Sequence, residues 1–102
     1  MFTHDIDPDI LFNAMEHKWN DVHGNKGGQW KRLTLQQALD LLKAEVKELE
    51  DAINSKDHRD VERVDNIILE SADVSNFAMI CANLAQRQVD NLDHKGAGSL
   101  DV

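Results

Sequence analysis

Residues 67–85 read Ile-Ile-Leu-Glu-Ser-Ala-Asp-Val-Ser-Asn-Phe-Ala-Met-Ile-Cys-Ala-Asn-Leu-Ala, and this stretch decides the fold. Its apolar side chains lie nearly all the way round a helical wheel, which is typical of a buried helix. Glu70 and Asp73 interrupt it at spacing i, i+3, so both carboxylates extend from the same side of the helix. A carboxylate buried alone would lose hydration worth several kcal/mol. We therefore expect these two acids to have a partner.

A second acid pair, Glu45 and Glu48, lies upstream in residues 35–54. The apolar residues of that stretch recur at helical spacing and form one stripe, with Glu45 at its edge and Glu48 just outside it. A Glu-x-x-Glu pattern alone is common on solvated helix faces. Two such pairs on neighbouring helices favour a site that holds cations. The stripe consists of Leu35, Ala38, Leu39, Leu42, Val46, Leu49 and Ile53.

Three helices are expected, over about residues 8–23, 35–54 and 58–93, with a break around residues 65–66 as one alternative for the third. No repeat, alternating strand pattern or hairpin signal occurs, so the predicted fold class is all-α, a helical bundle. Residues 1–94 are expected to form one domain. The tail, residues 95–102, contains two glycines and a serine and is expected to be disordered.

The helix starts have recognisable capping residues. Asp7 precedes Pro8, an N-cap followed by proline at the first helical position. Thr34 and Gln37 have the spacing of a capping box. Asp57 is a candidate cap for the third helix.

Composition limits the possible partners. The 102 residues carry a net charge of −8, with 29% charged and 5% aromatic residues. An acidic chain lacks the basic face that phosphate contacts require, so we expect no nucleic-acid partner. The polar residues within the apolar stretch argue against a membrane span.

A domain of this size has a thin core, so homo-oligomerisation is expected to complete the bundle. The single cysteine, Cys81, reads as a core residue in a reducing, cytoplasmic compartment.

The loop at residues 26–32 is the second candidate functional feature. Lys26, Lys31 and Arg32 concentrate positive charge beside two glycines whose N–H groups can approach an anion, and Trp30 could stack on a base. The alternative is an interhelical turn whose tryptophan closes the end of the bundle. The loop lacks the Gly-Lys-Ser/Thr ending of a Walker P-loop.

The chain has no His-x-x-x-His or Glu-x-x-His pattern, which disfavours zinc and di-iron sites. With oxygen ligands only, the preferred ion is Mg²⁺, with Mn²⁺ as a substitute.

The two acid pairs and their surroundings resemble the MazG-type all-α nucleoside triphosphate pyrophosphohydrolases. The resemblance covers residues 35–84, through Ala44-Glu45-Val46-Lys47-Glu48-Leu49 and Glu70-Ser71-Ala72-Asp73-Val74-Ser75-Asn76-Phe77-Ala78, and the short length and the Lys26–Trp30 loop are similar to small phage-type members. The family pattern has one more glutamate, directly before the first pair, where this chain has Ala44. The resemblance implies hydrolysis between the α- and β-phosphates, a dimer or tetramer, and a cytoplasmic location (that of the host for a phage-encoded protein).

The expected chemistry is metal-dependent. A triphosphate carries about four negative charges, so acids can hold it only through Mg²⁺ ions that bridge the phosphates. A water would attack the α-phosphorus in line, with Glu48 favoured over Glu45 as the base. Asn76 and Asn83 could bind sugar or base, although helix–helix hydrogen bonds inside an oligomer are the slightly favoured alternative for them. The expected metal ligands are Glu45, Glu48, Glu70 and Asp73, and the expected substrate-binding residues are Lys26, Trp30, Lys31, Arg32, Asn76 and Asn83.

Other functions remain open from the sequence. Analogy with the short phage-type members favours a purine deoxynucleotide, dGTP ahead of dATP. A dUTP or dCTP pyrophosphatase keeps the same metal site with another base. A non-enzymatic, antitoxin-like helical interaction protein would use the acids only as surface charge.

Overall fold

The computed structural model describes residues 4–22, 28–56 and 60–95, and the regular elements among these residues are all helices, with no strand. The predicted all-α fold class is confirmed. The elements are α1 (Pro8–Val22), a short 3-10 helix η2 (Gln29–Arg32), α2 (Leu35–Asn54) and α3 (Asp60–Lys95).

Two of the predicted caps are present. The Asp9 backbone N–H donates to Asp7 Oδ1 at 2.9 Å, and Pro8 is the first residue of α1. At the start of α2, the Gln37 N–H donates to Thr34 Oγ1 at 3.0 Å while the Thr34 N–H donates to Gln37 Oε1 at 2.9 Å. A side-chain cap of this kind contributes about 1 kcal/mol. The third candidate, Asp57, lies outside the described residues.

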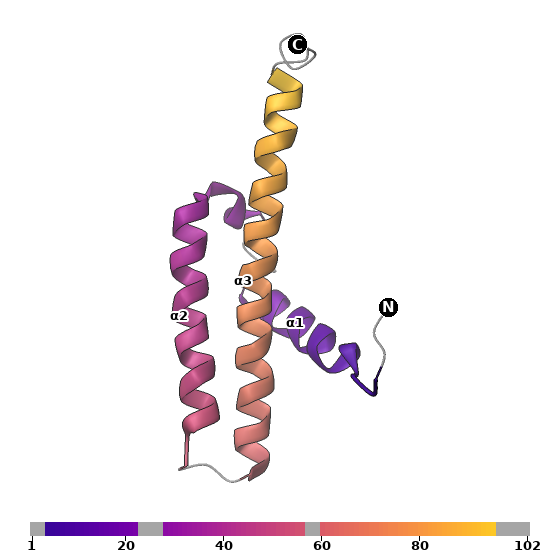
Figure 1. The fold of residues 1–102 in the computed structure, drawn as a ribbon, viewed down its shortest axis with the longest axis vertical. Coiled ribbons are helices and arrows are strands. Elements are labelled where there is room, and N and C mark those ends of the chain that lie inside the picture. The colour runs from indigo at the N-terminus through magenta and orange to yellow at the C-terminus, as the bar shows by residue number, and fades with distance from the viewer. Residues whose placement is uncertain (1–3, 23–27, 57–59, 96–102) are drawn as a thin grey trace.

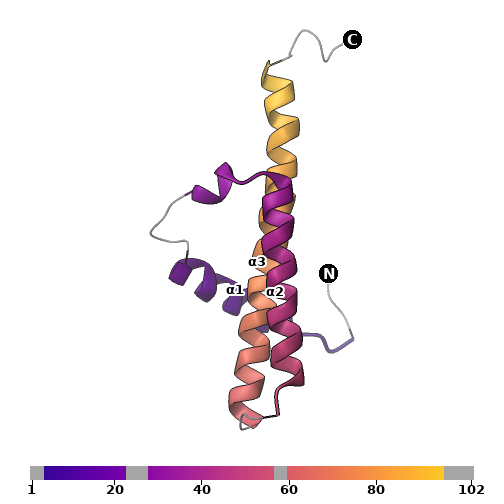
Figure 2. The same cartoon turned by 90° about the vertical axis from the view of Figure 1, so that its left-hand side faces the viewer.

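The long helices α2 and α3 lie side by side and antiparallel, and α1 crosses α3 at an angle (Figures 1 and 2). The molecule is elongated, with extents of 59 × 31 × 24 Å. At its C-terminal end α3 continues past the start of α2 (Figure 1). All side chains from residue 85 to residue 92 are exposed there.

Helix α3 corrects two sequence-based expectations. It continues without interruption from Asp60 to Lys95, so the alternative with a break around residues 65–66 is wrong. Asp65 and Asn66 are exposed and keep their hydration, and their weak helix propensity costs only a few tenths of a kcal/mol each. The tail was expected to start at Lys95, which is helical; residues 96–102 lie outside the described part of the chain.

The core is small and lies near the start of α2. Its buried members are Ala38 from α2 and Ile80 and Leu84 from α3. Trp30 of η2 packs against this cluster, so the tryptophan does help to close this end of the helix pair. The other partly buried residues packed against it are Trp19, Leu33, Leu35, Phe77 and Cys81.

The apolar stripe of α2 divides into two lines in the structure. One line is buried or half-buried and repeats at alternating spacings of three and four, as in a helix–helix seam. The other line is open: Leu39, Val46 and Ile53, spaced seven apart, are 37%, 48% and 46% exposed. A single chain therefore buries only part of the stripe. The seam positions are Leu35, Ala38, Leu42, Glu45, Leu49 and Ala52.

Candidate metal centre

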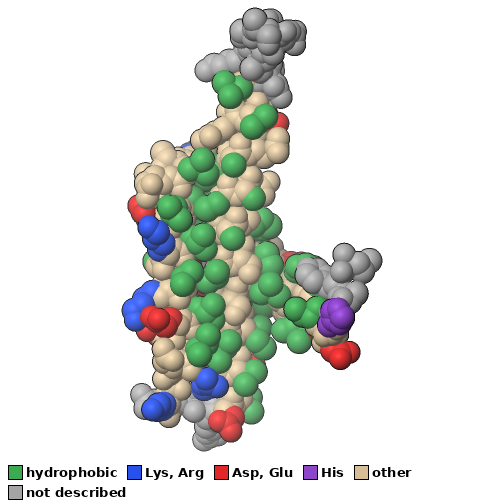
Figure 3. Space-filling model, in the orientation of Figure 1, with side chains coloured by type: hydrophobic (Ala, Val, Ile, Leu, Met, Phe, Trp, Pro, Cys, Tyr) green, Lys and Arg blue, Asp and Glu red, His purple; other side chains and the backbone are tan. Residues whose placement is uncertain are grey.

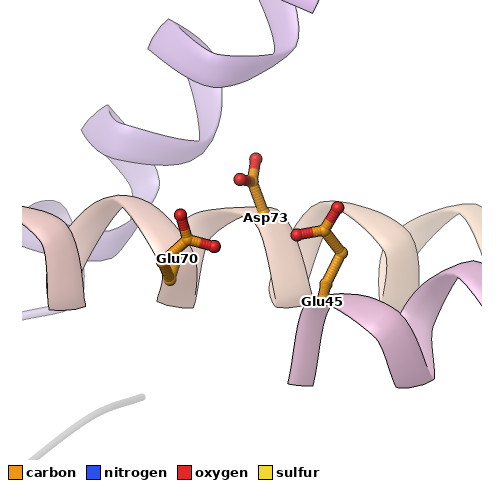
Figure 4. A group of neighbouring side chains, drawn as sticks. All are labelled: Glu45, Glu70 and Asp73. Atoms are coloured by element: carbon orange, nitrogen blue, oxygen red, sulfur yellow. The ribbon is translucent and has the colours of Figure 1, made fainter. Parts of the chain in front are cut away.

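Three carboxylates from two helices meet between α2 and α3. Glu45 of α2 and Glu70 and Asp73 of α3 each offer an oxygen, and these oxygens lie within 4.8 Å of one another. Figure 4 shows all three side chains extending to the same side of the helix pair, the side on which α1 lies. The structure thus brings together three of the four acids that the sequence singled out.

The fourth acid, Glu48, lies at the edge of this cluster. Its side chain is exposed, yet it lies close enough to Glu45 and Glu70 to affect the ionisation of both. Glu48 is one turn beyond Glu45 on α2 and just outside the seam, as its place in the helical pattern predicted.

The reason for the cluster lies in the seam itself. Glu45 occupies a seam position of α2. The seam positions on the turns before and after it are occupied by leucines, Leu42 and Leu49. Glu70 lies between half-buried Ile67 and Val74 at the matching spacing on α3. Two acids at positions that otherwise take apolar residues weaken the packing of the helix pair. Their presence there favours a functional role.

The ionisation of the cluster departs from that of free carboxyls. Burial, followed by a hydrogen bond and the negative charge of Glu48 and the charges of Asp73 and Glu70, raises the pKa of Glu45 from 4.5 to about 7. Burial and the charges of Glu48 and Asp73 also raise the pKa of Glu70, although the positive charge of Lys18 opposes the shift. A cluster in this state can both exchange protons near neutral pH and attract cations.

Two buried oxygens of the cluster fit a metal ligand set. Glu45 Oε2 and Glu70 Oε2 are shielded from solvent, and neither has a hydrogen-bond partner among the described residues. An octahedral ion with oxygens about 2.1 Å away would hold neighbouring ligands about 3 Å apart, so the carboxylates would have to rotate inward to close on it. Oxygen-only donors suit Mg²⁺ or Mn²⁺.

Lys18 of α1 is a site residue that the sequence analysis missed. Its Nζ lies 3.3 Å from Asp73 Oδ2, and the two side chains are 23% and 17% exposed. The two residues are 55 positions apart, and no periodicity connects them. Only the crossing of α1 over α3 brings them together.

A pocket lined by two tryptophans lies beside α3, on the C-terminal side of the acidic cluster. It has a volume of about 230 Å³ and is lined by Trp19, Trp30, Met79, Ile80 and Asn83. The structure thus places Trp30 and Asn83, both expected to bind substrate, in one pocket. Trp19 was missed, because in the sequence it is only an apolar residue of an amphipathic helix. A larger hollow of about 370 Å³ adjoins it and shares Trp19 and Met79.

The pocket and the cluster are within reach of one ligand. Ile80 and Asn83 lie seven and ten residues beyond Asp73 on α3. At a rise of about 1.5 Å per residue, these separations are about 10 and 15 Å along the helix. That distance is comparable with the length of an extended nucleotide.

The two asparagines have different surroundings. Asn76 is 3% exposed and its Nδ2 donates to the Met15 carbonyl oxygen at 3.0 Å, which ties α1 to α3. Asn83 is exposed and donates to the Met79 carbonyl oxygen at 2.9 Å. A helix–helix hydrogen bond was an alternative for both, and Asn76 makes one within the chain. A substrate role for Asn83 stays a prediction.

The cationic loop is only partly described. Lys31 and Arg32 are exposed on η2, and Lys31 Nζ lies 6.0 Å from the centre of the Trp30 ring. Lys26 lies outside the described residues. The expected contact of these cations with phosphate stays a prediction.

The fold and site define an all-helical protein with an acidic cluster between two antiparallel helices. Comparison of the chain with protein-family models, with curated proteins and with solved structures gave no match. The resemblance to the MazG-type hydrolases therefore remains a prediction, and function has to be argued from the site.

Proposed function

We propose that this protein is a metal-dependent nucleoside triphosphate pyrophosphohydrolase, which releases a nucleoside monophosphate and pyrophosphate. One observation carries the proposal: Glu45, Glu70 and Asp73 converge within 4.8 Å, with buried carboxylate oxygens on Glu45 and Glu70 that have no partner in the described part of the chain. Such a group repels a bare triphosphate and binds one that arrives with divalent cations.

Each part of the site has a role in this reaction. Glu45, Glu70 and Asp73 would hold Mg²⁺, with Mn²⁺ as a substitute, and the ion would supply charge neutralisation at the phosphates. Glu48, at the open edge, would accept the proton of the attacking water as the water oxygen bonds to the α-phosphorus and pyrophosphate leaves. Glu45 is the second candidate for that proton.

The tryptophan pocket would bind the base. Trp19 and Trp30 provide aromatic surface and Asn83 provides a polar group, which together suit a stacked base with one polar edge. We favour a purine deoxynucleotide, dGTP ahead of dATP, by analogy with the family that the sequence resembles. A dUTP or dCTP substrate is the alternative.

We also propose that the functional unit is a homodimer or tetramer. The radius of gyration is 17.2 Å, against about 13 Å for a compact chain of this length. Large apolar side chains are exposed on all three helices, and Figure 3 shows them gathered along the α2–α3 pair. A second copy covering this surface would remove an apolar patch of the kind that marks interfaces. Light scattering that shows a stable, active monomer at micromolar concentration would contradict this.

The same apolar surface bears on location. By length and composition alone, residues 60–92 of α3 could cross a membrane. The core helix of a soluble helical assembly meets the same criteria, and Glu70 and Asp73 lie in its middle. We propose a cytoplasmic oligomer with no membrane or nucleic-acid partner.

The test is a panel of the common NTPs and dNTPs, scored for pyrophosphate release with Mg²⁺, with Mn²⁺ and with EDTA. We expect release only with metal, and its loss in Glu70→Gln. Glu50→Gln is the matched control, because Glu50 is exposed, lies outside the cluster and pairs with Lys47 at 3.4 Å. Products of diphosphate and orthophosphate, or activity that survives EDTA, would show the assignment to be wrong. No activity and no saturable metal binding would favour the non-enzymatic interaction protein.

A further inference from the structure

Lys18 brings a positive charge from α1 into the acidic cluster. Its ammonium lies 3.3 Å from Asp73 Oδ2, and both side chains are mostly buried. The other ion pairs among the described residues join Lys47 to Glu50 and Asp51, with side chains more than 60% exposed. The Lys18–Asp73 pair is thus the one that is shielded from water and that belongs to the candidate centre.

One lysine cannot satisfy this cluster. Its ammonium contacts Asp73, while Glu45 Oε2 and Glu70 Oε2 remain buried without a hydrogen-bond partner. A divalent ion coordinated by the three carboxylates would supply twice the charge and would bond to both of these oxygens. Coordination of Asp73 by that ion and the close ammonium contact oppose each other, since two cations would then lie on one carboxylate.

The lysine has an anionic partner to move to. A nucleoside triphosphate bound through a divalent ion at these acids brings phosphate oxygens next to Asp73. Lys18 has a flexible four-carbon stem and a compact charge, and lysine is a common ligand for phosphate. A small swing of the side chain exchanges a carboxylate oxygen for a phosphate oxygen.

We propose that Lys18 is an internal counter-cation of the metal centre, which a divalent ion displaces from Asp73 and which then binds a phosphate of the substrate. This inference rests on the proposed function and adds a phosphate-binding residue to it. It also offsets part of the repulsion among the three converging acids before metal binds. The competing explanation is structural: Lys18 only clamps α1 to α3, as Asn76 does through the Met15 carbonyl.

The two explanations predict different metal affinities for Lys18→Met. If the lysine competes with the ion, the variant binds Mn²⁺ alone more tightly than the wild type, by about five- to tenfold. It binds Mn²⁺–triphosphate, with inorganic triphosphate as the probe, more weakly by a similar factor. A lysine that only clamps α1 to α3 would leave the affinity for Mn²⁺–triphosphate unchanged, because it would make no contact with phosphate. Both quantities are measured by electron paramagnetic resonance or calorimetry, without turnover.

Two further variants complete the experiment. Lys18→Arg keeps the charge and should retain triphosphate binding close to that of the wild type. Lys47→Met removes a lysine that also pairs with two acids but lies on the solvent side of α2, and it should change neither affinity. Melting curves of every variant establish that the proteins compared are folded, and Lys18→Gln, which also removes the charge, replaces Lys18→Met if that variant does not fold.

The outcomes separate this inference from the proposed function. Wild-type protein that binds no Mn²⁺ overturns both. Wild-type protein that binds Mn²⁺, with Lys18→Met binding it equally or less tightly, overturns the displacement alone. Tighter Mn²⁺ binding combined with weaker binding of Mn²⁺–triphosphate supports it.

Discussion

Glu45→Gln tests directly whether the cluster is strained without metal. The pKa of Glu45 is about 7 in the folded protein, against 4.5 for a free glutamate side chain. Below pH 4.5 the carboxyl group is protonated in both the folded and the unfolded protein, so it does not lower the free energy of unfolding. Between pH 4.5 and 7 the unfolded chain loses the proton that the folded chain retains, so the free energy of unfolding falls as pH rises, and it stays low above pH 7. The glutamine side chain does not titrate, so Glu45→Gln does not lose this free energy of unfolding as pH rises.

The magnitude follows from the shift. A change from 4.5 to about 7 corresponds to at most about 3 kcal/mol. Because the side chain is only half-buried, solvent screening lowers the expected gain to about 1 kcal/mol. For a chain of this size, that raises the melting temperature by about 5 °C. We therefore expect Glu45→Gln to melt about 5 °C above the wild type in EDTA at pH 8, and close to it at pH 5.

The assay is a set of melting curves at one protein concentration, since any oligomer makes the midpoint concentration-dependent. Glu50→Gln is the control, because the same substitution at an exposed site should change stability by less than about 0.5 kcal/mol. Excess Mg²⁺ should stabilise the wild type by mass action and Glu45→Gln much less. If Glu45→Gln melts below the wild type in EDTA at pH 8 while the control does not, these acids stabilise the fold as structural partners and the reasoning fails.

Three further predictions follow from the same geometry. Metal must displace the proton of Glu45, so Mn²⁺ affinity should fall about tenfold from pH 8 to pH 6; an affinity independent of pH would contradict the assignment of Glu45 as a ligand. Trp30→Ala should raise KM more than it lowers kcat, since loss of stacking is worth roughly 1–3 kcal/mol, and Trp19→Ala should do the same in steady-state assays. If both variants only unfold, with unchanged kinetics of the folded remainder, the tryptophans serve packing alone. Asn76→Ala should lower stability by about 1–3 kcal/mol in denaturant titrations, because it removes the bond from α3 to α1; unchanged stability would mean that this bond is not needed.

The helices were predictable because their signals are local. The Asp7 and Thr34 caps are encoded within a few residues, and the structure shows both hydrogen bonds. The convergence of Glu45, Glu70 and Asp73 was predictable for a similar reason. Acids at seam spacing on two antiparallel helices joined by a short connection are brought face to face.

Other features depend on contacts between distant segments. Lys18 and Trp19 join the site because α1 crosses α3, and no sequence period records the angle of that crossing. Glu48 lies at the edge of the three converging acids, as local helix geometry predicted, because about 100° of helical rotation separates it from the seam residue Leu49.

The sequence alone therefore determined an acidic, all-helical chain with its helix starts and two acid pairs at helical spacing, because hydrophobic period, capping and charge are properties of neighbouring residues. The tertiary structure decided which line of the α2 stripe faces α3 and which remains open, since the apolar residues of both lines belong to one continuous stripe in the sequence. It also decided that an ammonium lies on Asp73. Packing between segments that are distant in the chain determines both the open line of α2 and the Lys18–Asp73 contact, because this packing decides which side chains are buried.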